Sequence, residues 1–292
     1  MDLKNEPEEN QAVSENLVVT HRRKVRLYSV DANRVVDIAR HVWIGLLKRR
    51  SAYLTEKTLE RLNIKCTQLD LSTGAPSDGS EIFIRPFPTA RIHEILARTE
   101  PWHECKLLEK GFTRQSTAAL ILNCLVEWLT HNKGGTEKRL INYTDWHTRS
   151  MQYSEGERLY ESEIRDGRGP DWSVEKVLDK MDGLTPHVSC LLADTAPLRD
   201  AQLSRAEMWC ILRITYRRMK LREYRKHRII PVTVISAADR RVRIVQGYFD
   251  SEEGCVRVRK SPILDFDQGD VGQKIILLLS WCIGDTVGHT KA

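Results

Sequence analysis

The stretch PVTVISAADRRVRIVQGYFDSEEGCVRVRK, Pro231 to Lys260, decides the fold class. It contains three runs rich in β-branched and aromatic residues, Pro231 to Ser236, Arg241 to Phe249 and Cys255 to Lys260. Such runs are typical of strands, and connectors as short as those between them join neighbouring antiparallel strands. The stretch therefore predicts a three-stranded antiparallel meander.

Helices are predicted on both sides of this meander. From Leu203 to Lys226, large apolar residues such as Trp209 and Leu212 recur at three- and four-residue steps, which is the spacing of one helical face. An apolar segment from Lys274 to Ile283 predicts a closing helix. Helix, meander and helix in succession indicate an α+β protein rather than an alternating parallel one.

The rest of the chain is predicted to be mainly helical. The architecture we expect is a helical N-terminal and middle part packed on a small C-terminal antiparallel β-meander flanked by helices. The predicted elements are a strand at 25–30, a helix that Asn33 caps and whose last turn holds Lys48 to Arg50, helices at 55–62, 113–131 and 174–181, and a strand at 81–85, with an irregular excursion at 140–172.

Composition predicts one intracellular domain. The 292 residues are 41% hydrophobic and 29% charged, as in ordinary globular proteins. Residues 1–24 read as a disordered acidic tail, and residues 25–292 as a single α+β domain with a candidate sub-boundary in the 135–172 excursion. No apolar stretch reaches the roughly 20 residues that a membrane helix needs. Seven scattered cysteines indicate free thiols in a reducing compartment, so we expect a cytoplasmic or nuclear protein without membrane contact.

Positive charge is concentrated in the last third of the sequence. Between Arg205 and Lys260 there are 15 Lys and Arg against 6 Asp and Glu, a net of +9, whereas the whole chain carries +6. If Phe249 faces Cys255 across the hairpin, apolar residues share one side of the sheet. The opposite side then carries Arg243, Arg257 and Arg259, with Arg241 at its end.

Two interpretations of this basic face compete. In one, the arginines form a solvated outer surface. In the other, they bind anions together with the preceding helix, and the partner is an acidic protein or a nucleic acid. The candidate anion-binding residues are Arg241, Arg243, Arg257, Arg259, Arg217 and Arg218.

Familiar catalytic motifs are missing from the sequence. There is no glycine-rich phosphate loop, no Gly-x-Ser-x-Gly and no Cys-x-x-Cys. The pair His93-Glu94 lacks a second histidine, because the required position is Ala97. Trp102 to Cys105 fits the spacing of neither a zinc deaminase nor a cysteine nucleophile. The carboxylates from Glu155 to Asp166 are the best acid–base cluster, but we read them as a solvated helix face, because a catalytic pair would have to be buried. The catalytic residues, if there are any, therefore stay unknown; we predict no cofactor and no metal, and favour a non-enzymatic protein.

A resemblance adds a setting but no activity. The segments His227 to Ser236, Arg243 to Asp250 and Ser261 to Phe266, with Gly284-Asp285-Thr286 after the final helix, resemble the C-terminal region of uncharacterised proteins of filamentous ascomycete fungi. The resemblance implies a fungal cytosolic or nuclear protein. It also leaves open an alternative function, an accessory enzyme or accessory protein of fungal secondary metabolism that acts on a small molecule in a pocket.

Overall fold

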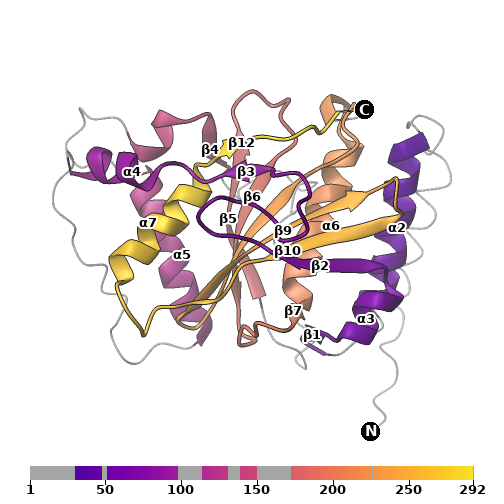
Figure 1. Ribbon diagram of the computed structural model, residues 1–292, viewed down its shortest axis with the longest axis horizontal. Coiled ribbons are helices and arrows are strands. Elements are labelled where there is room, and N and C mark those ends of the chain that lie inside the picture. The colour runs from indigo at the N-terminus through magenta and orange to yellow at the C-terminus, as the bar shows by residue number, and fades with distance from the viewer. Residues whose placement is uncertain are drawn as a thin grey trace, which may run out of the picture.

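A mixed β-sheet between two layers of helices makes up the described part of the chain (Figure 1). The computed structural model describes residues 30–47, 51–97, 114–130, 139–149, 172–224 and 226–291. Each face of the sheet has its own buried apolar cluster. Both faces are therefore covered, which explains why the strands read as apolar runs with few exposed positions.

The main sheet has eight strands. Their order is β2 (Ile64–Gln68), β10 (Cys255–Lys260), β9 (Arg241–Asp250), β8 (Val232–Ala238), β6 (Val188–Asp194), β5 (Trp172–Lys180) and β4 (Trp146–Arg149), and β11 (Leu264–Asp265) also pairs with β9. The pairs β10–β2 and β6–β8 are parallel, and the other neighbours are antiparallel. Two short antiparallel pairs lie outside this sheet, β1 (Tyr53–Leu54) with β7 (Leu203–Ser204) and β3 (Ile84–Arg85) with β12 (Asp285–Thr286).

The helices divide between the two faces. On one face lie α2 (Val30–Leu47), α3 (Glu56–Arg61) and α6 (Arg205–Lys220), and on the other lie α4 (Thr89–Leu96), α5 (Arg114–Thr130) and α7 (Val271–Cys282). Short 3₁₀ turns occupy Leu140–Tyr143 and Arg222–Tyr224. None of the helices in the described ranges is long and apolar enough to cross a membrane.

Helix α6 is held closely against the sheet. Its N-terminus carries a capping box, in which the Ser204 hydroxyl accepts the Glu207 N–H and the Glu207 carboxylate accepts the Ser204 N–H. Gly247 on β9 lets the helix approach, since a Cβ at this position would lie 2.6 Å from the Cδ1 of Ile211. Trp209 meets Trp43 of α2 edge to face, with ring centroids 4.1 Å apart.

The predicted mixture of helices and strands is confirmed, and so is the meander, which is formed by β8, β9 and β10. The sheet is much larger than the small one we expected. Strands β2, β4 and β6 come from segments for which the sequence had predicted no strand. In β6 every residue is buried, so the alternation that marks a half-exposed strand is lost.

The helix predicted at 174–181 is wrong, because this segment forms strand β5. Its apolar residues Val174, Val177 and Leu178 are spaced as on a helix. The register shifts between Val174 and Lys176, which inserts one extra residue into the strand. This bulge lets Val174 and Val177, three residues apart, pack into the same apolar cluster, and so imitates helical spacing.

Other boundaries differ by smaller amounts. Helix α6 ends at Lys220 instead of Lys226, and Val30, the last residue of the predicted strand at 25–30, is helical. The helices predicted at 55–62, 113–131 and 274–283 correspond to α3, α5 and α7. The acidic tail and most of the 140–172 excursion lie outside the described residues.

Cysteine chemistry differs from the expectation at one position. Cys66, Cys190, Cys210, Cys255 and Cys282 are free thiols. Cys124, on α5, is disulfide-bonded, so the expectation that all seven cysteines are free is wrong for this residue.

Candidate functional site

The β9–β10 hairpin has a different register from the predicted one. Asp250, not Phe249, faces Cys255, and Tyr248 faces Arg257. The turn contains four residues, and the Asp250 carboxylate organises it by accepting the N–H groups of Glu252 and Glu253. A slip of one residue exchanges the faces of one strand relative to the other. The predicted grouping of arginines on one face is therefore wrong.

Arg243 lies on the α6 face, and Arg257 and Arg259 lie on the opposite face. Arg243 is buried, with 1% of its side chain exposed, and its Nε donates to the equally buried Glu207 carboxylate at 2.7 Å. Its other nitrogens donate to the carbonyls of Arg199 and Gln202. Arg243 thus fastens α6 and the loop before it to the sheet.

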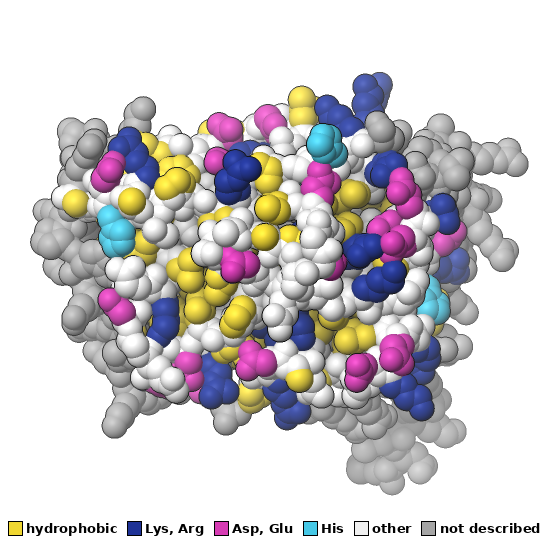
Figure 2. Space-filling view, in the orientation of Figure 1, with side chains coloured by type: hydrophobic (Ala, Val, Ile, Leu, Met, Phe, Trp, Pro, Cys, Tyr) yellow, Lys and Arg dark blue, Asp and Glu magenta, His cyan; other side chains and the backbone are white. Residues whose placement is uncertain are grey.

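The remaining predicted anion-binding residues are also dispersed. Arg218 forms a buried ion pair with Asp179 of β5, and Arg241 pairs with Asp265 at 3.4 Å. Arg217 is half-buried on α6. Asp179 and Asp265 lie outside the +9 segment in the sequence, so folding brings carboxylates to a region that looked uncompensated. On the face in Figure 2, basic and acidic side chains lie side by side.

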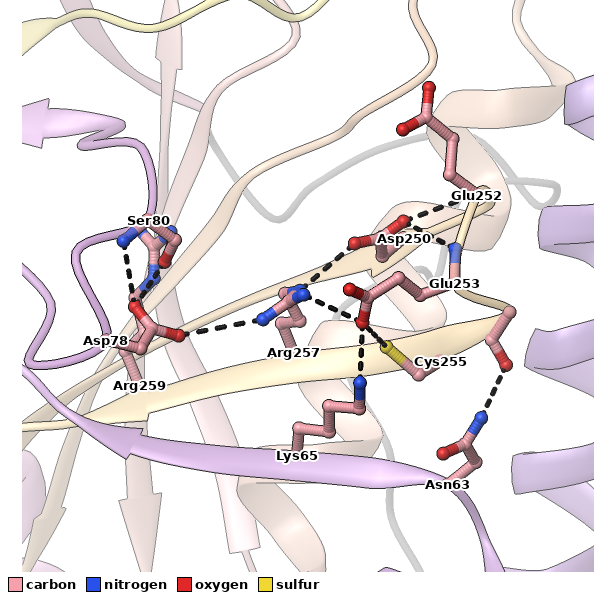
Figure 3. A network of polar contacts seen from close by, with 11 residues as sticks. Asn63, Lys65, Asp78, Ser80, Asp250, Glu252, Glu253, Cys255, Arg257 and Arg259 are labelled. Atoms are coloured by element: carbon pink, nitrogen blue, oxygen red, sulfur yellow. Dashed lines mark hydrogen bonds and ion pairs between the residues drawn. The ribbon is translucent and has the colours of Figure 1, made fainter.

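Arg257 is surrounded by carboxylates (Figure 3). Its guanidinium donates to Asp250 at 3.0 Å and lies 2.7 Å from Glu253 and 3.6 Å from Asp78. Lys65 of β2 donates to the same Glu253 carboxylate at 2.6 Å. Burial acts to raise the pKa of Asp250, but the hydrogen bonds from Glu253 and Arg257 outweigh it, and the pKa is lowered. The two cations, Arg257 and Lys65, are therefore already paired with carboxylates of the network itself.

The same hairpin contains the one group of potential metal ligands found among the described residues, Asp250, Glu253 and Cys255. Arg257 and Lys65 already supply the positive charge that a metal ion would supply. Burial raises the pKa of the Cys255 thiol to about 11. Because thiolates rather than thiols bind metals, the arrangement favours ion pairing over a metal.

Arg259 differs from its neighbours, because no carboxylate among the described residues forms an ion pair with it; Asp78, which accepts the Ser80 hydroxyl, attracts its charge only from a longer distance. Only 1% of it is exposed, and none of the ion pairs within 4.0 Å in the described ranges includes it. Its terminal nitrogens donate to neutral groups, the Gln246 amide at 2.9 Å and the Ser80 hydroxyl at 3.0 Å. Burial lowers its pKa. The guanidinium also lies over the rings of Phe83 and Tyr248, 5.0 and 5.2 Å from their centroids.

A buried polar row leads across the sheet to Arg259. Ser189, Thr233, Gln246 and Arg259 are cross-strand neighbours on β6, β8, β9 and β10. Gln246 donates to Thr233 at 3.3 Å. Two buried polar atoms of this row, Ser189 Oγ and Arg259 Nε, have no hydrogen-bond partner within the described part of the chain. Polar groups in this position cost stability unless they have partners, so the row is a candidate binding site.

A second buried polar cluster lies on the α6 face. Burial, together with the nearby carboxylate of Glu207, raises the pKa of Asp194 to about 7, although the hydrogen bond from the Ala196 N–H acts to lower it. Asp194 ends β6, beside the parallel strand β8, and it accepts the Ala196 N–H at 3.0 Å. A carboxyl group that titrates near neutral pH could exchange protons with a substrate, although Asp194 is itself buried.

The motifs considered in the sequence contribute little. His93 and Glu94 are exposed on α4. Trp102 to Cys105 and Glu155 to Asp166 lie outside the described residues. Ser189, Thr233 and Gln246 were not among the site residues predicted from the sequence. The available signal was a polar residue at an inward position of an otherwise apolar strand, which is seen clearly only when the register is known.

No protein-family model, curated protein or solved structure matches this chain significantly. The resemblance to fungal proteins therefore stays a prediction.

Proposed function

We propose that the protein binds the carboxylate or phosphate group of a small molecule, and that Arg259 supplies the positive charge. The observation that carries this proposal is the state of Arg259: a buried guanidinium that has neutral hydrogen-bond partners and a free Nε–H among the described residues. In the described ranges Arg259 lies beside the uncharged polar side chains of Gln246, Thr233 and Ser189, which can donate hydrogen bonds to the oxygens of such a group.

A buried charge is costly unless it has a counter-charge. Buried ions are normally paired, since removing them from water costs several kcal/mol. Arg218, Arg243 and Arg257 follow this rule. Phe83 and Tyr248 contribute cation–π attraction worth about 2 kcal/mol at a desolvated site. Asp78 attracts the guanidinium from a longer distance, and together these interactions offset only part of that cost. A ligand oxyanion would supply the rest and accept the Nε–H.

This proposal keeps one expectation from the sequence and changes another. The partner is acidic, as expected, but the buried position of Arg259 favours a small molecule over a nucleic acid or an acidic protein. The six arginines do not form a common platform. The alternative, an enzyme acting on a small molecule, finds its support in Asp194, because burial raises the pKa of its carboxyl group to about 7.

The arginine side-chain resonances test the proposal directly. In protein labelled with ¹⁵N-arginine, sulfate or acetate is titrated at pH 7, and the Nε–H resonance of Arg259 is followed to equilibrium. We expect it to shift saturably, and the comparison of the two salts separates phosphate-like from carboxylate ligands.

Two variants act as controls. Arg259→Gln removes the charge, and we expect it to abolish the binding measured by calorimetry. Arg257→Gln removes the neighbouring arginine of the same strand face, which already has carboxylate partners, and we expect binding to persist. Unchanged Nε–H resonances with both salts, or equal binding by Arg259→Gln, would overturn the proposed function.

A further inference from the structure

Arg259 is covered by one segment, and that segment is held in place by another. The cover is residues 80–85: Ser80 accepts from Arg259, and the ring of Phe83 lies against the guanidinium. We call residues 285–291 the strap. It runs along the cover in Figure 1 and pairs with it as β12 against β3. The Val287 N–H donates to the Phe83 carbonyl at 3.0 Å, and the His289 N–H donates to Glu81 at 2.6 Å.

Two buried histidines hold the strap on its other side. The Nε2 of His187 lies 3.1 Å from the Val287 carbonyl, and the Nδ1 of His227 lies 2.9 Å from the Thr290 hydroxyl. The amides of Arg228 and Ile229, directly after His227, donate to the Thr290 carbonyl. A strap of seven residues is thus fastened at two points by groups that can gain a proton.

The surroundings of His187 disfavour the uptake of a second proton. A carbonyl only accepts, so neutral His187 carries its proton on Nε2. Its Nδ1 is buried and has no partner among the described residues. A second proton would place an unpaired N–H and a charge in this interior, and burial accordingly lowers the pKa of His187 to about 4.

The charged groups around the two histidines do not favour protonation overall. The hydrogen bond to the Val287 carbonyl acts to raise the pKa of His187, but burial outweighs it, and Lys180, His227 and Arg218 act in the same direction as burial. Burial also lowers the pKa of His227; Lys291 adds to this effect, whereas Asp182 and a hydrogen bond with the Leu184 backbone oppose it. Exposed His289 is paired with Glu81. A carboxylate compensates the positive charge at His227, whereas none does so at His187, so His187 is the point at which acid works against the closed strap.

We infer that the strap is an acid-released latch, which lifts with the cover when His187 and His227 are protonated and so opens the Arg259 site to its oxyanion. This inference rests on the proposed function for its purpose, but not for its mechanism. When the strap is released, His187 and His227 are no longer buried by it and regain their ordinary affinity for protons, so protons favour the open state. Neutral pH favours the closed state.

The difference between the two pKa values of His187 sets how strongly the open fraction of the strap depends on pH. With His187 at about 4 in the closed state and at its ordinary 6.5 in the open state, linkage increases the open fraction about 30-fold at pH 5. Hydrogen exchange measures this fraction without any ligand. After correction for intrinsic rates, we expect the protection of the Arg228 and Ile229 amides, which donate to the strap from outside it, to fall about 30-fold between pH 7.5 and pH 5. Amides in the middle of β8 should keep their protection.

Variants identify the groups involved. His187→Gln carries no titratable proton, so we expect most of the pH dependence to vanish. Thr290→Val keeps both histidines but removes the hydroxyl that His227 contacts, and we expect lower protection of the strap at every pH. Constant protection in the wild type, or an equal loss of protection in β8, would overturn the latch.

The two proposals fail separately. Sulfate stays doubly charged from pH 5 to pH 7.5, so its association with Arg259 can be followed by the same Nε–H resonance at both values. We expect association to be about 30-fold faster at pH 5, in proportion to the open fraction. Loss of strap protection without any sulfate effect would refute the binding function and leave the latch. A sulfate effect with constant strap protection would refute the latch and leave the binding function.

Discussion

The guanidinium of Arg243 lies against the carboxylate of Glu207, 36 residues earlier in the chain, and both side chains are buried. The pair joins the first turn of α6 to the middle of the sheet, and Glu207 also caps its own helix through the Ser204 N–H. One carboxylate therefore has two structural tasks. Charge that looks functional in the sequence is here part of the packing.

Breaking this pair on one side should be costly. Glu207→Gln leaves a buried guanidinium without a counter-charge, and we expect the free energy of unfolding to fall by about 3–5 kcal/mol. Urea denaturation monitored by circular dichroism measures it. Arg243→Met combined with Glu207→Gln should cost less than the sum of the two single changes, because neither variant group is then an unpaired ion. A loss below about 1 kcal/mol for Glu207→Gln, as at an exposed ion pair, would contradict this view.

The sequence predicted the local elements of the C-terminal third well, for a physical reason. In β8, β9 and β10 the residues between short turns have strong strand preferences, and consecutive antiparallel strands need no long-range information. The sequence could not predict the strand β6, because a fully buried strand and a buried helix have similar composition. It also could not predict β5, since the bulge at Glu175 imitates a helical pattern.

The candidate site depended on a single residue of register. With Phe249 opposite Cys255, three arginines would share an exposed face, whereas the actual pairing of Asp250 with Cys255 separates Arg243 from Arg259. The turn length that fixes this register is set by hydrogen bonds that the Asp250 carboxylate accepts from the turn, which composition does not reveal. The second helical layer, which buries both faces, was equally invisible in the hairpin sequence.

The contact between α6 and β9 gives a second prediction. A methyl group at Gly247 would meet Ile211 at 2.6 Å, so Gly247→Ala should destabilise the protein by about 1–3 kcal/mol through overpacking. Thermal unfolding followed by calorimetry provides the measurement. The further change Ile211→Ala should recover part of the loss, because it removes the atoms that clash. Additive effects of the two changes would show that α6 does not pack on β9 at this point.

The aromatic contacts of Arg259 give a third prediction, on stability in the absence of ligand. Phe83→Leu keeps an apolar cover but removes the ring that lies over the guanidinium. We expect the free energy of unfolding to fall by about 1–2 kcal/mol. The same change in an Arg259→Met background should cost less, since no cation remains to interact with the ring. Equal costs in the two backgrounds, measured by urea denaturation, would show that the ring acts by packing alone.

Asp194 gives a fourth prediction, on the pH dependence of stability. Its pKa is about 7 in the folded protein, against an ordinary value of 3.8. Between about pH 4 and pH 7 the folded state therefore holds a proton that the unfolded state has released, and stability contributed by this group falls as pH rises, by up to about 1.4 kcal/mol per pH unit.

Asp194→Asn removes this dependence. The variant should gain stability relative to the wild type as pH rises from 4 to 7, and level off above that. The difference between the two stability curves cancels the opposite effect of His187. Asp70→Asn is the matched control: hydrogen bonds from Ser72 and Thr73 lower the pKa of Asp70 to about 2, so its difference curve should be flat across this window. A flat curve for Asp194→Asn as well would mean that Asp194 is ionised in the folded protein and unsuited to exchange protons near neutral pH.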